Sequence, residues 1–275
     1  MQVINAVQII DILGTNSIPI KVLAEDAEIY FAKTIFKTHP PLEDIINELI
    51  GNFIYSSWGI RVPEINVIKI ENELLQRFIT DNNIVTKYSD YNLEELFIIG
   101  VKEVVNQIDV DIHNLTITSK NDFNKFLNPY LFLDIAFCDI WLGNKDRRIN
   151  NTNLLLVEDY GKLDFVAIDH TQLFANQINY KGLKITIMDS DLSNMLITTD
   201  FTKKICKFAE KEIISTYHNR ILEKIGITLD VLPNFLDLLP SEIGLSKAGR
   251  KKIIEVLENQ ERNNRVANKL INLLR

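Results

Sequence analysis

The chain has 275 residues, of which 46% are hydrophobic and 24% charged, a composition that excludes an intrinsically disordered protein. Its formal net charge of −7 argues against a surface that binds nucleic acid through overall positive charge, so no direct nucleic-acid partner is expected. A chain of this length buries a sizeable core, either in one large domain of two lobes or in two smaller domains.

The cysteines and the apolar segments indicate the cellular compartment in which the protein is expected. Cys138 and Cys206 are the two cysteines and lie in apolar or helical contexts, which favours a reducing cytoplasm over a disulfide scaffold. Residues 1–6 lack the basic start and cleavage site of a signal peptide. The most apolar segment, residues 130–142, carries two aspartates and is too short to span a bilayer, so we expect a buried helix and no membrane partner.

The N-terminal elements begin with two apolar runs, residues 7–13 and 18–23, which predict two strands joined by a turn. The turn contains Gly14, Thr15 and Ser17, whose backbone N–H groups and hydroxyls suit a phosphate. An ordinary hairpin turn explains the same residues equally well.

A third strand is predicted over residues 28–33, where alternation places Lys33 on the face opposite Tyr30 and Ala32. In kinases a lysine on such a strand contacts the nucleotide phosphates. The alternative is a solvated surface lysine.

An amphipathic helix is predicted over residues 41–58 from the spacing of its apolar residues. Glu48 lies near the edge of the apolar face. It is therefore placed either to turn inward and pair with Lys33, fixing the lysine for phosphate contact, or to face solvent.

Two carboxylates in the middle of the chain match the needs of phosphoryl transfer. That reaction requires one carboxylate aimed at the acceptor hydroxyl, and a second carboxylate with an amide oxygen on Mg²⁺. Asp146, followed five residues later by Asn151, supplies the first carboxylate and the amide on one short loop. Asp169 follows the apolar run 165–168 and supplies the second carboxylate.

Between these carboxylates, residues 153–157 and 162–166 predict a strand, a turn and a strand. Such a hairpin brings Asn151 and Asp169 towards each other, as a divalent metal site requires. In the alternative interpretation, Asp146 forms an ion pair in its loop with the neighbouring arginine, and Asp169 only caps a buried strand.

The remaining predictions concern helices. Residues 92–105 and 121–142 are expected to be helical after a lobe boundary near residues 84–92. Residues 195–275 are expected to be predominantly helical. The segment 253–274 carries most of its apolar residues on one side, which favours packing against its own lobe, with a partner-binding helix as the alternative.

Taken in order, several segments resemble the HipA-like kinases, a bacterial family distantly related to protein kinases and phosphoinositide kinases. The compact single-chain subgroup is the more similar one, and the resemblance covers most of the chain. The segments that carry it are Asn47-Glu48, Gly59-Ile60-Arg61-Val62-Pro63-Glu64, Trp141-Leu142-Gly143-Asn144-Lys145-Asp146-Arg147, Asn151-Thr152-Asn153-Leu154-Leu155 and Ala167-Ile168-Asp169-His170.

The resemblance implies an α+β, two-lobed protein-kinase-like fold that binds Mg-ATP. A small β-rich N-lobe, residues 1–88, would bind the nucleotide, and residues 89–275 would form a larger, mainly helical C-lobe. The implied roles are a base or hydroxyl-orienting group for Asp146, metal ligands for Asn151 and Asp169, and a phosphate contact for Lys33.

The chain departs from the family in its phosphate turn, which has few glycines, and in residues 84–88, which match only loosely the strand that leads into the lobe connection. Family members phosphorylate a serine in their own phosphate loop, which here makes Ser17 the candidate.

The expected activity is transfer of the ATP γ-phosphate to a serine or threonine of a protein acceptor. Some relatives are toxins paired with an antitoxin, so an antitoxin or regulatory protein is a candidate partner. A lipid or small-molecule kinase fits the same residues, because fold does not fix substrate. A nucleotide-binding pseudokinase is the non-enzymatic alternative, against which the retention of Lys33, Asp146, Asn151 and Asp169 counts.

Overall fold

The fold is that of a computed structural model, which describes residues 1–14, 18–34, 42–84, 86–189 and 195–269. The chain divides into two compact units. The first contains Met1–Ile46 and Pro63–Val105, and the second contains Asn47–Val62 and Asn106–Arg275.

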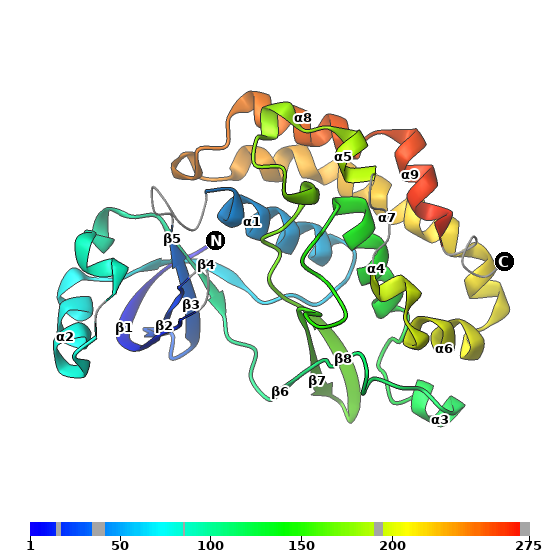
Figure 1. The fold of residues 1–275 in the computed structure, drawn as a ribbon, viewed down its shortest axis with the longest axis horizontal. Coiled ribbons are helices and arrows are strands. Elements are labelled where there is room, and N and C mark those ends of the chain that lie inside the picture. Colours follow the sequence, from blue (N-terminus) through cyan, green and yellow to red (C-terminus); the bar gives the residue numbers. More distant parts are fainter. Residues whose placement is uncertain (15–17, 35–41, 85, 190–194, 270–275) are drawn as a thin grey trace. The chain divides into compact units, whose positions relative to one another are not determined.

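The first unit is built on a closed five-stranded barrel (Figure 1). Around the barrel the strands follow the order β1-β2-β3-β5-β4, and only the β1–β4 pair is parallel. The strands are β1 (Val3–Ile12), β2 (Ile20–Ala24), β3 (Ile29–Thr34), β4 (Ile65–Lys69) and β5 (Ile98–Lys102). The three strands predicted before residue 34 are thereby confirmed.

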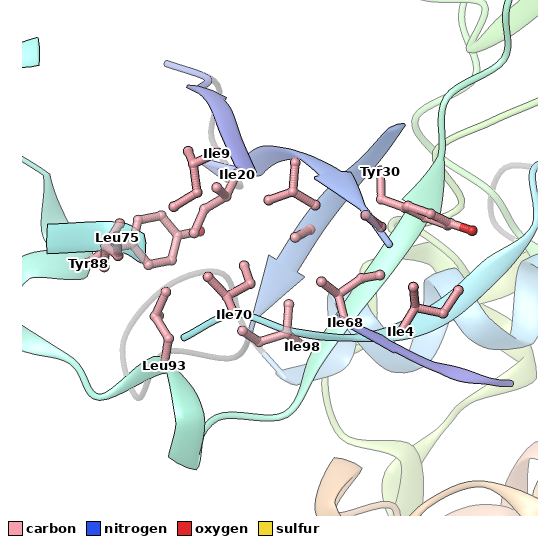
Figure 2. Packing of buried hydrophobic residues seen from close by; sticks show 13 residues of the cluster. Ile4, Ile9, Ile20, Tyr30, Ile68, Ile70, Leu75, Tyr88, Leu93 and Ile98 are labelled. Atoms are coloured by element: carbon pink, nitrogen blue, oxygen red, sulfur yellow. The ribbon is translucent and has the colours of Figure 1, made fainter. Parts of the chain in front are cut away.

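Apolar side chains fill the barrel of the first unit. Figure 2 shows Ile20, Ile70 and Ile98 pointing into the space between the strands, with Ile4 and Tyr30 at one end. At the other end α2 (Asn72–Asn82) contributes its buried Leu75. Short 3₁₀ turns at Lys87–Asp90 and Leu93–Glu95 follow α2.

Two expectations in this region are wrong. Residues 92–105 do not form a helix, because β5 pairs antiparallel with both β3 and β4. A short apolar run fits a buried strand as well as a helix, and a Cβ on Gly100 would lie 2.3 Å from Cγ1 of Ile68, so the strand needs glycine there. Near residues 84–88, Lys87 begins a 3₁₀ turn and not a strand.

The second unit is mainly helical. Its small sheet has the order β6-β7-β8, and β7 with β8 confirms the predicted hairpin. Figure 1 shows α7 as a long helix, alongside which α8 and α9 pack. The elements are β6 (Gln107–Asp109), α3 (Lys120–Phe123), α4 (Leu131–Leu142), β7 (Leu154–Asp159), β8 (Lys162–Ala167), α5 (Ile185–Asp189), α6 (Asp200–Phe208), α7 (Lys211–Leu238), α8 (Lys247–Leu257) and α9 (Gln260–Ala267). The predicted helix at residues 41–58 is α1 (Leu42–Ser57), of which the part from Asn47 belongs to this unit.

Helix α4 lies at the centre of the second unit. All twelve of its side chains are buried, as expected for the most apolar segment of the chain. Its buried Asp134 accepts from the hydroxyl of Tyr217 at 2.6 Å and from Nη2 of Arg220 at 2.9 Å. Both of these partners come from α7, so the carboxylate ties the two helices together.

Two predicted helices are each divided. Residues 121–142 form α3 and α4 with an irregular stretch between them, in which Pro129 disfavours a helical residue before it. The C-terminal segment breaks between α8 and α9, where Asn259 caps α9 by accepting from the N–H of Arg262 at 2.9 Å.

The coarse prediction of a mixed α and β fold, with a strand-rich N-terminal part and a helical C-terminal part, is confirmed. None of the described helices is both long and apolar enough to cross a membrane.

Candidate functional site

The loop that carries Asp146 starts where α4 ends. Gly143 closes the helix in the left-handed conformation, with φ of 63° and ψ of 41°, and a Cβ there would lie 3.2 Å from the amide nitrogen of Ala175. Glycine is thus required both for the turn and for the close approach. The N–H of Ala175 donates to the carbonyl of Gly143 at 2.8 Å, and the N–H of Lys145 donates to the carbonyl of Gln172 at 3.0 Å. These bonds join the loop to the segment after Asp169.

The backbone N–H and both carboxylate oxygens of Asp146 form hydrogen bonds. Its backbone N–H donates to Oδ1 of Asn144 at 3.0 Å. Oδ2 of Asp146 accepts from Nδ2 of Asn153 at 2.8 Å, and Oδ1 accepts from Nε2 of Gln172 at 3.2 Å. The carboxylate is half-buried and has a fixed orientation.

A buried ion pair supports this loop. Arg147 and Asp139 are fully buried, and Nε of Arg147 donates to Oδ1 of Asp139 at 3.0 Å. Nη1 of Arg147 donates to the carbonyl oxygen of Thr152 at 2.8 Å and to that of Asn153. Burial lowers the pKa of Arg147, but attraction to Asp139 and Tyr55, together with the hydrogen bonds to them, outweighs burial and raises the pKa above its ordinary value. The alternative in which Arg147 pairs with Asp146 is wrong, because Arg147 turns to α4.

The same carboxylate of Asp139 receives two further donors. Nδ2 of Asn144 donates to Oδ1 at 3.0 Å, and the hydroxyl of Tyr55 donates to the same atom. Tyr55 is fully buried, and burial followed by the charge of Asp139 raises its pKa well above the ordinary value. Tyr55 therefore stays protonated and acts as a donor.

The hairpin connects the candidate metal ligands Asn151 and Asp169. Asn151 is exposed, and its Nδ2 lies 3.5 Å from the carbonyl oxygen of Asp146. Asp169 follows β8 with φ of 53°, so the chain turns sharply at the carboxylate. The N–H of Ile168 donates to the carbonyl of Asn153 at 3.0 Å, which ties the two segments together.

The donor set of this region fits a divalent cation only in part. An amide oxygen and a carboxylate are ligands that Mg²⁺ accepts, and Mg²⁺ at nucleotide sites takes its remaining ligands from phosphates and water. Across the described part of the chain no group of three or more His, Cys, Asp or Glu side chains is placed to hold a metal. A cation bound by Asn151 and Asp169 would thus depend on phosphate oxygens.

His170 fixes the chain directly after Asp169. It is fully buried and stacks on Tyr55, with ring centroids 4.3 Å apart. A Cβ on Gly51 of α1 would lie 2.3 Å from Cβ of His170, so only glycine lets this turn of α1 approach the histidine.

Asn47 fixes the following residues. Its Nδ2 donates to the carbonyl of Thr171 at 2.7 Å, and its Oδ1 accepts from the hydroxyl of Tyr180 at 2.9 Å. Asn47 is buried, and so is the adjacent Glu48. Glu48 therefore turns inward, as the first of the two alternatives predicted.

The remaining predicted residues belong to the first unit. Lys33 is half-buried on β3 and faces away from Tyr30 and Ala32, as predicted. The predicted pair of Lys33 with Glu48 involves residues of both units and stays a prediction. Gly14 is exposed, and a Cβ there would meet nothing within 4 Å. Thr15 and Ser17 lie outside the described residues.

Comparison with known proteins identifies the family. A sequence model of the HipA-like kinases matches residues 15–226. The chain belongs to the HipA-like kinase family. It is therefore a kinase, as the motifs around Asp146 and Asp169 predicted.

Among solved structures, the chain is similar to the proinflammatory kinase CtkA of Helicobacter pylori, with 18% identity and a TM-score of 0.54, over 98% of this chain and 96% of that one. It also matches the Golgi casein kinase with Mn and ADP bound, with 12% identity and a TM-score of 0.41, over 97% of this chain and 74% of that one. The first match shows a kinase-like fold. No curated protein sequence matches the chain.

Four site residues were not predicted from the sequence: Tyr55, Asp139, Asn153 and Gln172. Asp139 could have been singled out from the sequence, because a carboxylate inside an apolar helix needs a buried polar partner. Asn153 lies two residues beyond Asn151, and amides close to a catalytic carboxylate are candidates for orienting it.

Proposed function

We propose that this HipA-like kinase is a two-lobed, Mg-ATP-dependent protein serine/threonine kinase that uses Asp146 as its base or hydroxyl-orienting group. The observation that carries the proposal is the fixed carboxylate of Asp146, on a loop bonded through Asn153 to the residue preceding Asp169. A kinase needs little covalent chemistry beyond positioning and charge stabilisation.

In the proposed reaction the acceptor hydroxyl oxygen attacks the γ-phosphorus of ATP. The bond from that phosphorus to the bridging oxygen breaks, ADP leaves, and the hydroxyl proton passes to Asp146. Asn151 and Asp169 would hold Mg²⁺, which would neutralise developing charge on the phosphates. Lys33, with Gly14, Thr15 and Ser17 of the phosphate turn, would contact the nucleotide, and Glu48 would orient Lys33.

The proposed N-lobe is residues 1–88 and the proposed C-lobe is residues 89–275. We further propose that the acceptor is a protein, that a toxin-like role with an antitoxin or regulatory partner applies, and that the protein is cytoplasmic. Ser17 is the proposed site of autophosphorylation. Phosphopeptide mapping that finds phosphate only elsewhere would remove this last assignment.

Two variants test the proposed roles. Asp146→Ala removes the hydroxyl-orienting carboxylate, so transfer is lost while calorimetric affinity for Mg-ATP stays within about twofold of wild type. Asp169→Asn removes a charge from the cation site, so both affinity and transfer fall. Full transfer activity in either variant would refute the role assigned to that residue.

A further inference from the structure

The two oxygens of the Asp146 carboxylate each accept one hydrogen bond from a neutral amide. Nδ2 of Asn153 donates to Oδ2 at 2.8 Å, and Nε2 of Gln172 donates to Oδ1 at 3.2 Å. Asn153 comes from the start of the hairpin, and Gln172 comes from the segment after Asp169. The two ends of the metal-ligand hairpin therefore both reach the carboxylate.

Gln172 is itself held in place by bonds other than the one to Asp146. Nδ2 of Asn176 donates to Oε1 of Gln172 at 3.1 Å, so the amide of Gln172 presents its nitrogen to Asp146. The carbonyl of Gln172 accepts from the N–H of Lys145, the residue before Asp146, at 3.0 Å. Gln172 is thus bonded to the loop through both its backbone and its side chain.

Asn153 is fixed in a similar way. Its backbone is left-handed, with φ of 46°, and its carbonyl accepts from Nη1 of the buried Arg147 and from the N–H of Ile168, the latter at 3.0 Å. The backbone that carries the Asn153 side chain is therefore held by these two hydrogen bonds.

The neutrality of both donors matters for the chemistry. A carboxylate has about four lone-pair sites, so two amide bonds leave room for an acceptor hydroxyl. A cation on the same oxygens would favour the ionised form and weaken the group as a proton acceptor. The cation next in sequence, Arg147, is instead drawn to Asp139 at 3.0 Å. Asp146 is oriented without an ion pair to Arg147.

We propose that Gln172 and Asn153 are positioning residues that hold the carboxylate of Asp146 towards the acceptor hydroxyl. Gln172 also couples this carboxylate to the segment that begins at Asp169, so that base and cation site keep a fixed relation. This inference rests on the proposed function of Asp146.

Gln172→Ala provides the main test. Misplacing a reacting group by about 1 Å costs on the order of a hundredfold in rate, so we expect kcat to fall about ten- to hundredfold. KM for Mg-ATP should stay within about twofold, because Gln172 orients the base and does not bind nucleotide.

Gln172→Glu keeps the shape of the side chain and replaces a neutral donor with a like charge beside Asp146. A glutamate carboxylate has no N–H to donate in place of the 3.2 Å bond to Oδ1 of Asp146, so kcat should fall at least as far as in Gln172→Ala, with KM for Mg-ATP within about twofold of wild type. A residue with a purely structural role would tolerate this replacement of equal shape.

Gln177→Ala is the matched control. Gln177 lies in the same segment, and its amide makes three bonds, to the carbonyls of Phe174 (2.9 Å) and Lys184 (3.2 Å) and from the N–H of Lys184 (2.8 Å). None of them involves Asp146, so kcat should stay within about twofold of wild type.

The outcomes separate the two proposals. If Asp146→Ala is inactive but Gln172→Ala and Gln172→Glu keep the wild-type kcat, the positioning role is overturned and the proposed function stands. If wild type transfers no phosphate or Asp146→Ala is fully active, the proposed function fails and takes this inference with it. Equal losses of kcat in Gln172→Ala and Gln177→Ala, with a wild-type kcat in Gln172→Glu, would also overturn the positioning role.

Discussion

The guanidinium of Arg147 donates from Nε to Oδ1 of Asp139 at 3.0 Å, and neither side chain is exposed to solvent. Asp139 lies in α4 and Arg147 lies in the loop that follows Gly143, so the ion pair joins the central helix to the residue next to Asp146. This bond makes the loop part of the helical core.

Removal of Arg147 should therefore destabilise the protein. Arg147→Met leaves Asp139 as an uncompensated buried charge, which costs about 3–5 kcal/mol in the free energy of unfolding. The exposed pair of Lys203 and Asp200, at 3.0 Å, is the control, and Lys203→Ala should cost less than about 1 kcal/mol. Urea titrations of both variants measure the difference, and equal costs would show that the buried pair is not a core interaction.

Two glycines in helices should respond in opposite directions to alanine. Gly51→Ala places a Cβ 2.3 Å from Cβ of His170 and should destabilise by about 1–3 kcal/mol. Gly226→Ala in α7 meets nothing within 4 Å and should stabilise by about 0.5–1 kcal/mol, since glycine weakens a helix interior. Thermal unfolding of the two variants checks this, and a stabilised Gly51→Ala would contradict the packing of His170 on α1.

Some elements of the fold could be predicted from the sequence and others could not. The hairpin of β7 and β8 was visible because two short apolar runs flank a Tyr-Gly turn, and Lys33 was placed correctly by strand alternation. Strand β5 was mistaken for a helix, since an apolar run without a clear period fits both and the pairing partners lie far away in sequence.

The candidate site shows the same limit. Asp146, Asn151 and Asp169 could be proposed as site residues from the sequence, because carboxylates and an amide at this spacing suit phosphoryl transfer. The bond from Gln172 to Asp146 spans 26 residues, and nothing in the sequence near Gln172 indicates it. The alternative that paired Arg147 with Asp146 rested on their being neighbours in sequence, whereas the fold places Asp139 beside Arg147.

Burial should make Cys206 respond to alkaline pH. Burial raises the pKa of the Cys206 thiol from 9.0 to about 11. The unfolded chain loses this proton from about pH 9 and the folded chain only near pH 11, so the folded state binds more protons in that window and stability falls as pH rises.

Comparing wild type with Cys206→Ala in unfolding experiments from pH 8 to 11 measures this effect. The gap in stability between the two proteins should change across the window, and iodoacetamide should modify folded Cys206 more slowly than a free thiol at pH 9. A pH-independent gap with rapid modification would contradict the burial of this thiol.

Asn47 should stabilise the segment that follows Asp169. Asn47→Ala removes the bonds at 2.7 Å to the carbonyl of Thr171 and at 2.9 Å from the hydroxyl of Tyr180, at a cost of about 1–3 kcal/mol. Tyr180→Phe keeps the bond to Thr171 and should cost about 0.5–1.5 kcal/mol. Amide hydrogen exchange across residues 171–180 should rise more in the first variant. Equal exchange in both would show that the Thr171 bond contributes little.

We propose that this chain transfers phosphate from ATP by means of Asp146. The most direct measurement is mass spectrometry of the purified protein and of a set of added serine- and threonine-bearing acceptor proteins, after incubation with Mg-ATP, for wild type and Asp146→Ala side by side. We predict phosphate-sized mass gains with wild type that are absent with Asp146→Ala. No gain on the chain or on any acceptor with wild type, or equal gains with both proteins, would contradict the claim.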